Sequence, residues 1–151
     1  MRGFQPVKIK HTKHATVETM IPTRSTKGSS GYDFYSKEEV TIMPNESHLF
    51  WTDVMAYMLQ DETMLLFVRS SVGTKLGLKL KTAVSVIDSD YYDNEKNGGN
   101  IGICLYNYST EPVTIKVHER IAQGVFQKYL IADNDICLSE TRKGGYGSSG
   151  R

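Results

Sequence analysis

Residues 78–92 of this chain are LKLKTAVSVIDSDYY, and the polar run DNEKNGGN follows over residues 93–100. Apolar and polar residues alternate through the first nine positions, which is the period of a half-buried β-strand. The alternation returns in IGICLY, residues 101–106. Two alternating runs joined by a turn-rich segment predict a β-hairpin. Near the end of its first strand stand an acidic residue, Asp88, and an aromatic one, Tyr91.

Short stretches of β-favouring residues also lie on both sides of this hairpin. Further strands are expected at residues 7–10, 32–36, 40–42, 49–51, 63–68, 113–117 and 124–126. Helical periodicity is confined to residues 71–76, and residues 54–59 are ambiguous between helix and strand. The pattern predicts an all-β fold, a sandwich, jelly roll or barrel, with at most one or two short helices.

Composition sets limits on the class of protein. With 151 residues, 39% of them hydrophobic and 23% charged, the chain is expected to form one soluble domain. A net charge of +1 favours neither nucleic acid nor a membrane surface as a partner. No apolar run approaches the roughly 20 residues that span a bilayer. The first residues lack the apolar core of a signal peptide, and the two cysteines have no metal-ligand spacing, so we expect a cytoplasmic protein with reduced thiols.

The end of the chain differs in composition from the rest. Residues 140–151, ETRKGGYGSSGR, are too rich in glycine and serine to pack a core. We therefore expect a β-domain over residues 1–139 and a flexible glycine-rich segment over residues 140–151, the tail.

Five short motifs follow one another along the chain. They are Gly31-Tyr32-Asp33, Arg69-Ser70-Ser71-Val72-Gly73, Val86-Ile87-Asp88-Ser89-Asp90-Tyr91, Glu119-Arg120-Ile121-Ala122-Gln123 and Arg142-Lys143-Gly144-Gly145-Tyr146-Gly147-Ser148-Ser149-Gly150. In this order and spacing they resemble the five signature motifs of the trimeric deoxyuridine triphosphatases (dUTPases). The resemblance implies a jelly-roll or β-barrel-like fold that assembles as a homotrimer with shared active sites. It also implies hydrolysis of dUTP to dUMP and pyrophosphate, which limits uracil incorporation into DNA.

The third motif carries the chemistry of the reaction. A carboxylate at a strand end, such as Asp88, is placed to orient and deprotonate water, and the resemblance makes it the catalytic base. Its alternative role is to cap the turn that follows. The resemblance implies that Tyr91 packs against the deoxyribose and leaves no room for a 2′-hydroxyl. Tyr91 is equally compatible with a place in the core, and both roles can hold for one ring.

The second and fourth motifs supply groups for the phosphates. Arg69, Ser70 and Ser71 offer a guanidinium, two hydroxyls and backbone N–H groups at the expected start of a short helix, which suit phosphate. A plain helix-capping serine is the alternative. By the resemblance, Gln123 is a further phosphate contact. The role of Arg120 stays open between the site and a structural pairing with a carboxylate.

Three positions of the hairpin are assigned to binding of the base. The family commonly has glycine where Ser85 stands, and often asparagine where Thr82 stands, near the uracil edge. Together with Ile87 these positions are expected to bind substrate, and backbone groups of the hairpin can still read the base. The loop over residues 92–98 is longer than in the commonest form and is similar to that of some Gram-positive bacterial and phage members.

The tail is expected to close over a bound nucleotide. The resemblance implies that Arg142 meets the γ-phosphate and that Tyr146 stacks on uracil, a contact worth about 1–3 kcal/mol per base. In the closed tail, the residues expected beside the phosphates are Gly147, Ser148 and Ser149. The alternative is a terminus without a role.

The expected cofactor is Mg²⁺, which usually takes its oxygen ligands from substrate phosphates and water. We expect no site made of protein ligands alone, with Asp33 near the metal through water. Two other functions stay open: a dCTP deaminase-like enzyme of the same superfamily, and a regulatory binding protein that responds to dUTP. Asp88 and the complete glycine-rich tail favour a dUTPase, because the deaminases use a glutamate.

Overall fold

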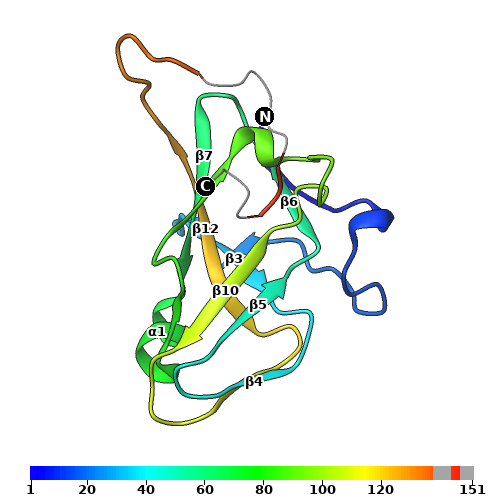
Figure 1. The fold of residues 1–151 in the computed structure, drawn as a ribbon, viewed down its shortest axis with the longest axis vertical. Coiled ribbons are helices and arrows are strands. Elements are labelled where there is room, and N and C mark those ends of the chain that lie inside the picture. Colours follow the sequence, from blue (N-terminus) through cyan, green and yellow to red (C-terminus); the bar gives the residue numbers. More distant parts are fainter. Residues whose placement is uncertain (138–143, 147–151) are drawn as a thin grey trace.

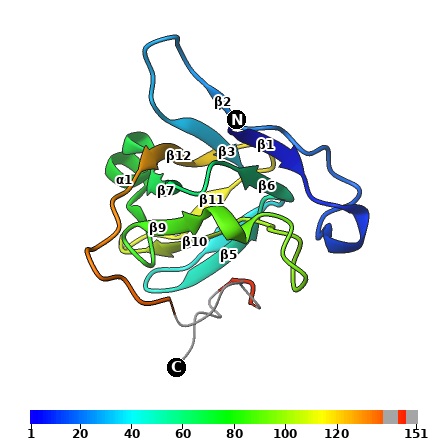
Figure 2. The same ribbon diagram turned by 90° about the horizontal axis from the view of Figure 1, so that it is seen from above.

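The computed structural model describes residues 1–137 and 144–146, and Figures 1 and 2 show it from two directions. In chain order its elements are β1 (Gly3–Pro6), η1 (Ile9–His11), β2 (Thr23–Arg24), β3 (Tyr32–Tyr35), β4 (Val40–Ile42), β5 (Ser47–Trp51), β6 (Val54–Tyr57), β7 (Glu62–Val68), α1 (Ser70–Leu76), β8 (Leu78–Leu80), β9 (Ser85–Asp88), η2 (Ser89–Tyr91), β10 (Gly102–Asn107), β11 (Val113–Ile115) and β12 (Arg120–Lys128). The labels η1 and η2 denote single turns of 3₁₀-helix. The predicted all-β fold with short helices is confirmed.

Most strands that are neighbours in the sheets are not consecutive in the chain, as in a jelly roll, and the pair β2-β3 is the exception. The largest sheet has the order β2-β3-β12-β7-β9, and a second has the order β5-β10-β8. Two strand pairs, β1-β6 and β11-β4, complete the fold. Strand β12 runs antiparallel to both β3 and β7, and it crosses the middle of the molecule in Figure 1.

The core lies between the two larger sheets. Met64, Leu66 and Ile87 are buried residues of the five-stranded sheet, and they cluster with Leu80 and Leu105 of the three-stranded sheet. Burial of one such side chain is worth about 1.5–3 kcal/mol. Because successive residues of a strand face opposite sides, the neighbours of these residues lie on the outer face of the five-stranded sheet.

The alternating run over residues 78–86 is not one strand, so that prediction is wrong. Strand β8 ends at Leu80 and pairs with β10, whereas β9 begins at Ser85 and pairs with β7 in the other sheet. The turn between them holds Ala83 at φ 64°, with its N–H donated to the carbonyl of Leu80 at 3.0 Å. Val84 and Val86 continue the apolar phase of the run, but both are exposed, and β9 buries Ile87 instead, so the pattern alone does not reveal the turn.

Two other predictions differ from the structure near the N-terminus. Residues 7–10 form no strand: β1 ends at Pro6, Val7 is buried, and η1 follows. The ambiguous segment 54–59 contains strand β6, which pairs with β1. The short helix predicted at 71–76 is present as α1, and Gly77 ends it in the left-handed conformation that favours glycine, at φ 67°.

Asp53, at the corner between β5 and β6, joins several parts of the chain. Its carboxylate accepts hydrogen bonds from the N–H groups of Lys13 (2.8 Å) and His14 (2.9 Å) and from the amide of Asn100 (2.9 Å). It also pairs with the ammonium group of Lys37 at 3.0 Å, and both side chains are almost fully buried. Burial alone would raise the pKa of Asp53, but these donors outweigh it and lower that pKa below its ordinary value.

In the part of the chain that the structure describes, no helix is long and apolar enough to cross a membrane.

Replacement of Asp53 tests this junction. Asp53→Asn leaves the buried ammonium group of Lys37 without its counter-charge, so we expect a loss of about 3 kcal/mol in the free energy of unfolding. Urea unfolding at fixed protein concentration measures it. The matched control is Asp61→Asn, which breaks the exposed pair with Lys128 and should cost less than about 1 kcal/mol.

The same junction predicts a pH dependence. Because folding lowers the pKa of Asp53, its contribution is present above the ordinary carboxyl pKa of about 3.9 and is lost as the pH falls through the folded value. The stability difference between wild type and Asp53→Asn should therefore shrink at acidic pH. Equal stability of the two proteins at pH 7 would contradict the role given to this carboxylate.

Candidate functional site

Asp88 is the last residue of β9 and is exposed on the outer face of the five-stranded sheet. It lies opposite Thr63 of β7, whose hydroxyl donates to the carbonyl of Ile87 at 3.0 Å. A hollow beside it is lined by Thr63, Leu65, Val86, Asp88, Gln127, Lys128 and Tyr129. The carboxylate thus stands at a fixed strand end with open space beside it, as a general base for water requires.

Tyr91 closes the 3₁₀ turn that follows Asp88, and only 6% of its surface is exposed. The ring belongs to the hydrophobic core cluster, so the core role that the sequence allowed is present. Its hydroxyl donates to the carbonyl of Asn100 at 2.8 Å and accepts from the side-chain amide of Asn97 at 2.7 Å. Packing and hydrogen bonds therefore hold the ring in one position.

The three residues assigned to uracil binding offer different groups to a ligand. The Ile87 side chain is buried in the core, so only its backbone is available to a ligand. The hydroxyls of Thr82 and Ser85 lie 2.8 Å apart across the turn that precedes β9. These two side chains therefore stabilise the turn, which explains how the chain tolerates threonine and serine at these positions.

Asp33, in β3, is the centre of a second group of predicted residues. It is 5% exposed, and its two oxygens pair with Arg69 Nε at 2.8 Å and with Arg120 at 3.3 Å. The Ser25 hydroxyl donates to it at 3.1 Å. Arg120, whose role the sequence left open, thus pairs with a carboxylate. Asp33 fixes two guanidinium groups, one after the end of β7 and one at the start of β12.

Gln123 belongs to the same group, since it lies opposite Asp33 in the pairing of β12 with β3. Gly31 faces its side chain: a Cβ at that position would come within 2.3 Å of the Gln123 Oε1 atom. A side chain at position 31 would therefore displace the Gln123 amide from this place. Ser70 and Ser71 open α1 directly after Arg69, so the second motif joins the group from the end of β7.

The two groups lie at opposite ends of β7. Asp88 is paired with Thr63, near the start of that strand, whereas Arg69 directly follows its last residue, Val68. Six residues of extended chain separate Thr63 from Arg69, which corresponds to about 20 Å at 3.3 Å per residue. One phosphorus atom beside Asp88 is therefore out of reach of Arg69 of the same chain.

The described part of the tail rests on its own chain. The ring of Tyr146 packs against that of Trp51, at the end of β5, with centroids 5.7 Å apart and planes at 70°. Burial raises the pKa of the Tyr146 phenol. The other tail residues assigned to substrate, Arg142, Gly147, Ser148 and Ser149, lie outside the described residues. Stacking of Tyr146 on uracil stays a prediction.

Sequence reasoning missed the asparagines of the loop after Tyr91. Asn94 and Asn100 are buried, and Asn97 donates to the Tyr91 hydroxyl. The run DNEKNGGN indicated only a turn. The signal that could have singled them out is three asparagines at a spacing of three, each able to hydrogen-bond the local backbone.

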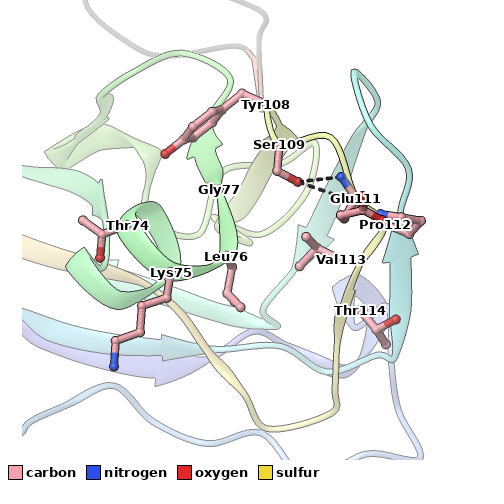
Figure 3. Close-up of a pocket in the computed structure, with 10 residues that line it drawn as sticks. All are labelled: Thr74, Lys75, Leu76, Gly77, Tyr108, Ser109, Glu111, Pro112, Val113 and Thr114. Atoms are coloured by element: carbon pink, nitrogen blue, oxygen red, sulfur yellow. Dashed lines mark hydrogen bonds between the residues drawn. The ribbon is translucent and has the colours of Figure 1, made fainter.

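Another hollow lies at a different place in the fold, between α1 and the segment that joins β10 to β11 (Figure 3). Its lining residues are Thr74, Lys75, Leu76, Gly77, Tyr108, Ser109, Glu111, Pro112, Val113 and Thr114. The Ser109 hydroxyl in its wall donates to the Glu111 carbonyl at 2.9 Å. None of the predicted site residues that the structure describes lines it, so the hollow beside Asp88 is the candidate site.

Comparison with known proteins agrees with the motif order. The dUTPase family model matches residues 17–150. The deoxyuridine 5′-triphosphate nucleotidohydrolase of Lactococcus lactis is 42% identical over 151 residues, which covers 99% of this chain and 98% of that protein. This chain belongs to the dUTPase family. The enzyme of the same name from swinepox virus is 38% identical over 135 residues, covering 87% of this chain and 89% of the viral protein.

Solved dUTPase structures share the fold. The crystal structure of dUTPase from Streptococcus mutans superposes with a TM-score of 0.76 at 37% identity, covering 87% of this chain and 98% of that one. The dUTPase from phage phi11 of Staphylococcus aureus, described for its species-specific insert, gives a TM-score of 0.70 at 21% identity, covering 92% and 97%. The predicted likeness to Gram-positive and phage dUTPases is thereby confirmed.

Proposed function

We propose that this chain hydrolyses dUTP to dUMP and pyrophosphate, with Asp88 as the base. The observation that carries the proposal is the position of Asp88, exposed at the end of β9 beside an open hollow, in a chain of the dUTPase family. Such an activity removes dUTP before it enters DNA and supplies dUMP. No observation favours the deaminase or the purely regulatory alternative.

The products define the bond that breaks. Asp88 accepts a proton from a water molecule as the water oxygen bonds to the α-phosphorus. The bond between that phosphorus and the oxygen that bridges to the β-phosphate breaks, and pyrophosphate leaves with the electron pair. Groups that hold the phosphates stabilise the charge that develops there, and Arg69, Ser70 and Gln123 are proposed for this role.

The position of Tyr91 supports its proposed contact with the sugar. It lies three residues after the base, and its ring is held by the core and by two hydrogen bonds. A ring that is held in place excludes a ribose 2′-hydroxyl more strongly than a mobile ring does. A mobile ring could move aside and relieve the clash. Uracil would be bound through backbone groups near Ile87 and the turn that holds Thr82 and Ser85.

We propose that the site is shared between subunits of a homotrimer. The separation of Asp88 from Arg69 along β7 supports this arrangement, because a phosphorus atom beside Asp88 lies out of reach of Arg69 of the same chain. Exposed apolar side chains support an interface as well: Val86 is 59% exposed on the outer sheet face, and Leu130 is 98% exposed beyond β12. A closed ring of three copies would cover such surfaces.

Magnesium is proposed to enter with the triphosphate. The donor set fits this arrangement, since both oxygens of Asp33 already accept bonds from arginines or Ser25, and a metal bound to phosphates and water needs few protein ligands. When bound, the ion would neutralise charge on the phosphates. Asp33 would then act at the site by holding Arg69 and Arg120 in place, with any contact to the metal through water.

The tail, residues 140–151, is proposed to close over the nucleotide and to carry Arg142, Tyr146, Gly147, Ser148 and Ser149 to it. Closure would exclude bulk water from the reacting phosphate. We also propose a cytoplasmic location: both cysteines are free thiols in the structure, which suits a reducing compartment.

Removal of the base tests the chemistry. Asp88→Asn keeps the volume of the side chain but loses its basicity, so turnover of dUTP should fall by at least about 100-fold. Binding of a non-hydrolysable dUTP analogue, measured by calorimetry, should change little. Asp90→Asn removes a carboxylate two residues away and is expected to retain most activity. Near-normal turnover of Asp88→Asn would exclude this residue as the base.

Subunit mixing tests the shared site. Asp88→Asn and Arg69→Ala should each be nearly inactive alone. If Asp88 and Arg69 of one site come from different chains, random mixed trimers regain intact sites, and about a quarter of wild-type turnover is expected for equal amounts. The chains are dissociated, mixed and reassembled before the assay. If both residues of a site came from one chain, no mixture would recover activity.

A further inference from the structure

The loop over residues 92–98, which we call the insertion loop, is held tightly at both ends. Gly98 and Gly99 adopt φ values of 65° and 71°, which side chains rarely allow. At Gly98 a Cβ would come within 2.5 Å of the His11 ring, and at Gly99 within 2.8 Å of the Tyr91 carbonyl. The hydroxyl of Tyr92 donates to Gln5 at 2.8 Å. The loop is therefore a fixed part of the fold and able to position a neighbour.

Asn97 is the residue of the insertion loop that touches Tyr91. Its Nδ2 atom donates to the Tyr91 hydroxyl at 2.7 Å and to the Asn100 carbonyl at 3.3 Å. Its Oδ1 atom accepts from the Asn94 amide at 2.8 Å and from the Gly99 N–H at 3.2 Å. The surrounding groups thus offer two acceptors to the Asn97 nitrogen and two donors to its oxygen. A flipped amide would lose these hydrogen bonds, so the side chain is fixed in one orientation.

We propose that Asn97 is a positioning residue for substrate choice: it fixes the ring of Tyr91 against the sugar. The proposal rests on the sugar contact of Tyr91 given above. Asn97 does not touch substrate. It acts through the Tyr91 hydroxyl: without this donor the ring is held less firmly and yields more readily to a 2′-hydroxyl.

The test compares hydrolysis of dUTP and UTP. Asn97→Asp keeps an oxygen for Asn94 and Gly99 but loses the donor to Tyr91, so the ratio of kcat/KM for dUTP over UTP should fall about two- to tenfold, the worth of one hydrogen bond. Most of the change in this ratio should come from a higher kcat/KM for UTP. Lys96→Ala, at an exposed position of the same loop, is the matched control and should keep the wild-type ratio.

A double-mutant cycle separates positioning from a general effect on folding. Tyr91→Phe keeps the ring and removes the hydroxyl, so it should lower the ratio to a similar extent even if Asn97→Asp folds poorly. In the Tyr91→Phe background, Asn97→Asp should add less than about twofold, because the two changes break the same contact. Additive effects, or an unchanged ratio in Tyr91→Phe, would overturn the proposal.

Failure of the proposed function would appear differently: the wild-type protein itself would not hydrolyse dUTP, or would not prefer it to UTP.

Discussion

The buried carboxylate of Asp53 is the constraint on which the arrangement of the site depends. It binds the N-terminal segment through Lys13 and His14, the β3–β4 connection through Lys37, and Asn100 before β10. A buried charge is tolerated only with such a set of partners, so these segments are held in one arrangement. The carbonyl of Asn100 in turn accepts from the Tyr91 hydroxyl. A stability element and the proposed sugar wall therefore belong to one network.

The second constraint is the length of β7. Its two ends present different chemistry: a carboxylate near Thr63, and guanidinium groups organised by Asp33 beyond Val68. The core requires β7 to be extended between them, because Met64 and Leu66 must both face inward. The fold thus separates the proposed base from the proposed phosphate ligands within a chain, and the proposed assembly would bring them together. In this account the trimer is a requirement of catalysis as well as a way to cover apolar surface.

The sequence predicted well where its patterns are local. Motif order led to the family, and strand alternation located most strands, since buried residues at every second position are a direct consequence of sheet geometry. It failed at the turn around Ala83, because the alternation is the same on both sides of the crossing. It allowed a pairing of Arg120 with a carboxylate but did not identify Asp33 as the partner of Arg69 and Arg120, because these residues lie far apart in sequence. It also missed Asn97, whose role depends on the three-dimensional position of Tyr91.

The account is tested most directly by a crystal structure of the assembled protein with Mg²⁺ and a non-hydrolysable dUTP analogue. It predicts that the α-phosphorus lies within one water molecule of Asp88 from one subunit, while the phosphate chain contacts Arg69 of another. The deoxyribose should pack on Tyr91, with Asn97 still bonded to the tyrosine hydroxyl. A nucleotide bound by Asp88 and Arg69 of the same chain, or bound away from Asp88 in the hollow beside α1, would contradict it.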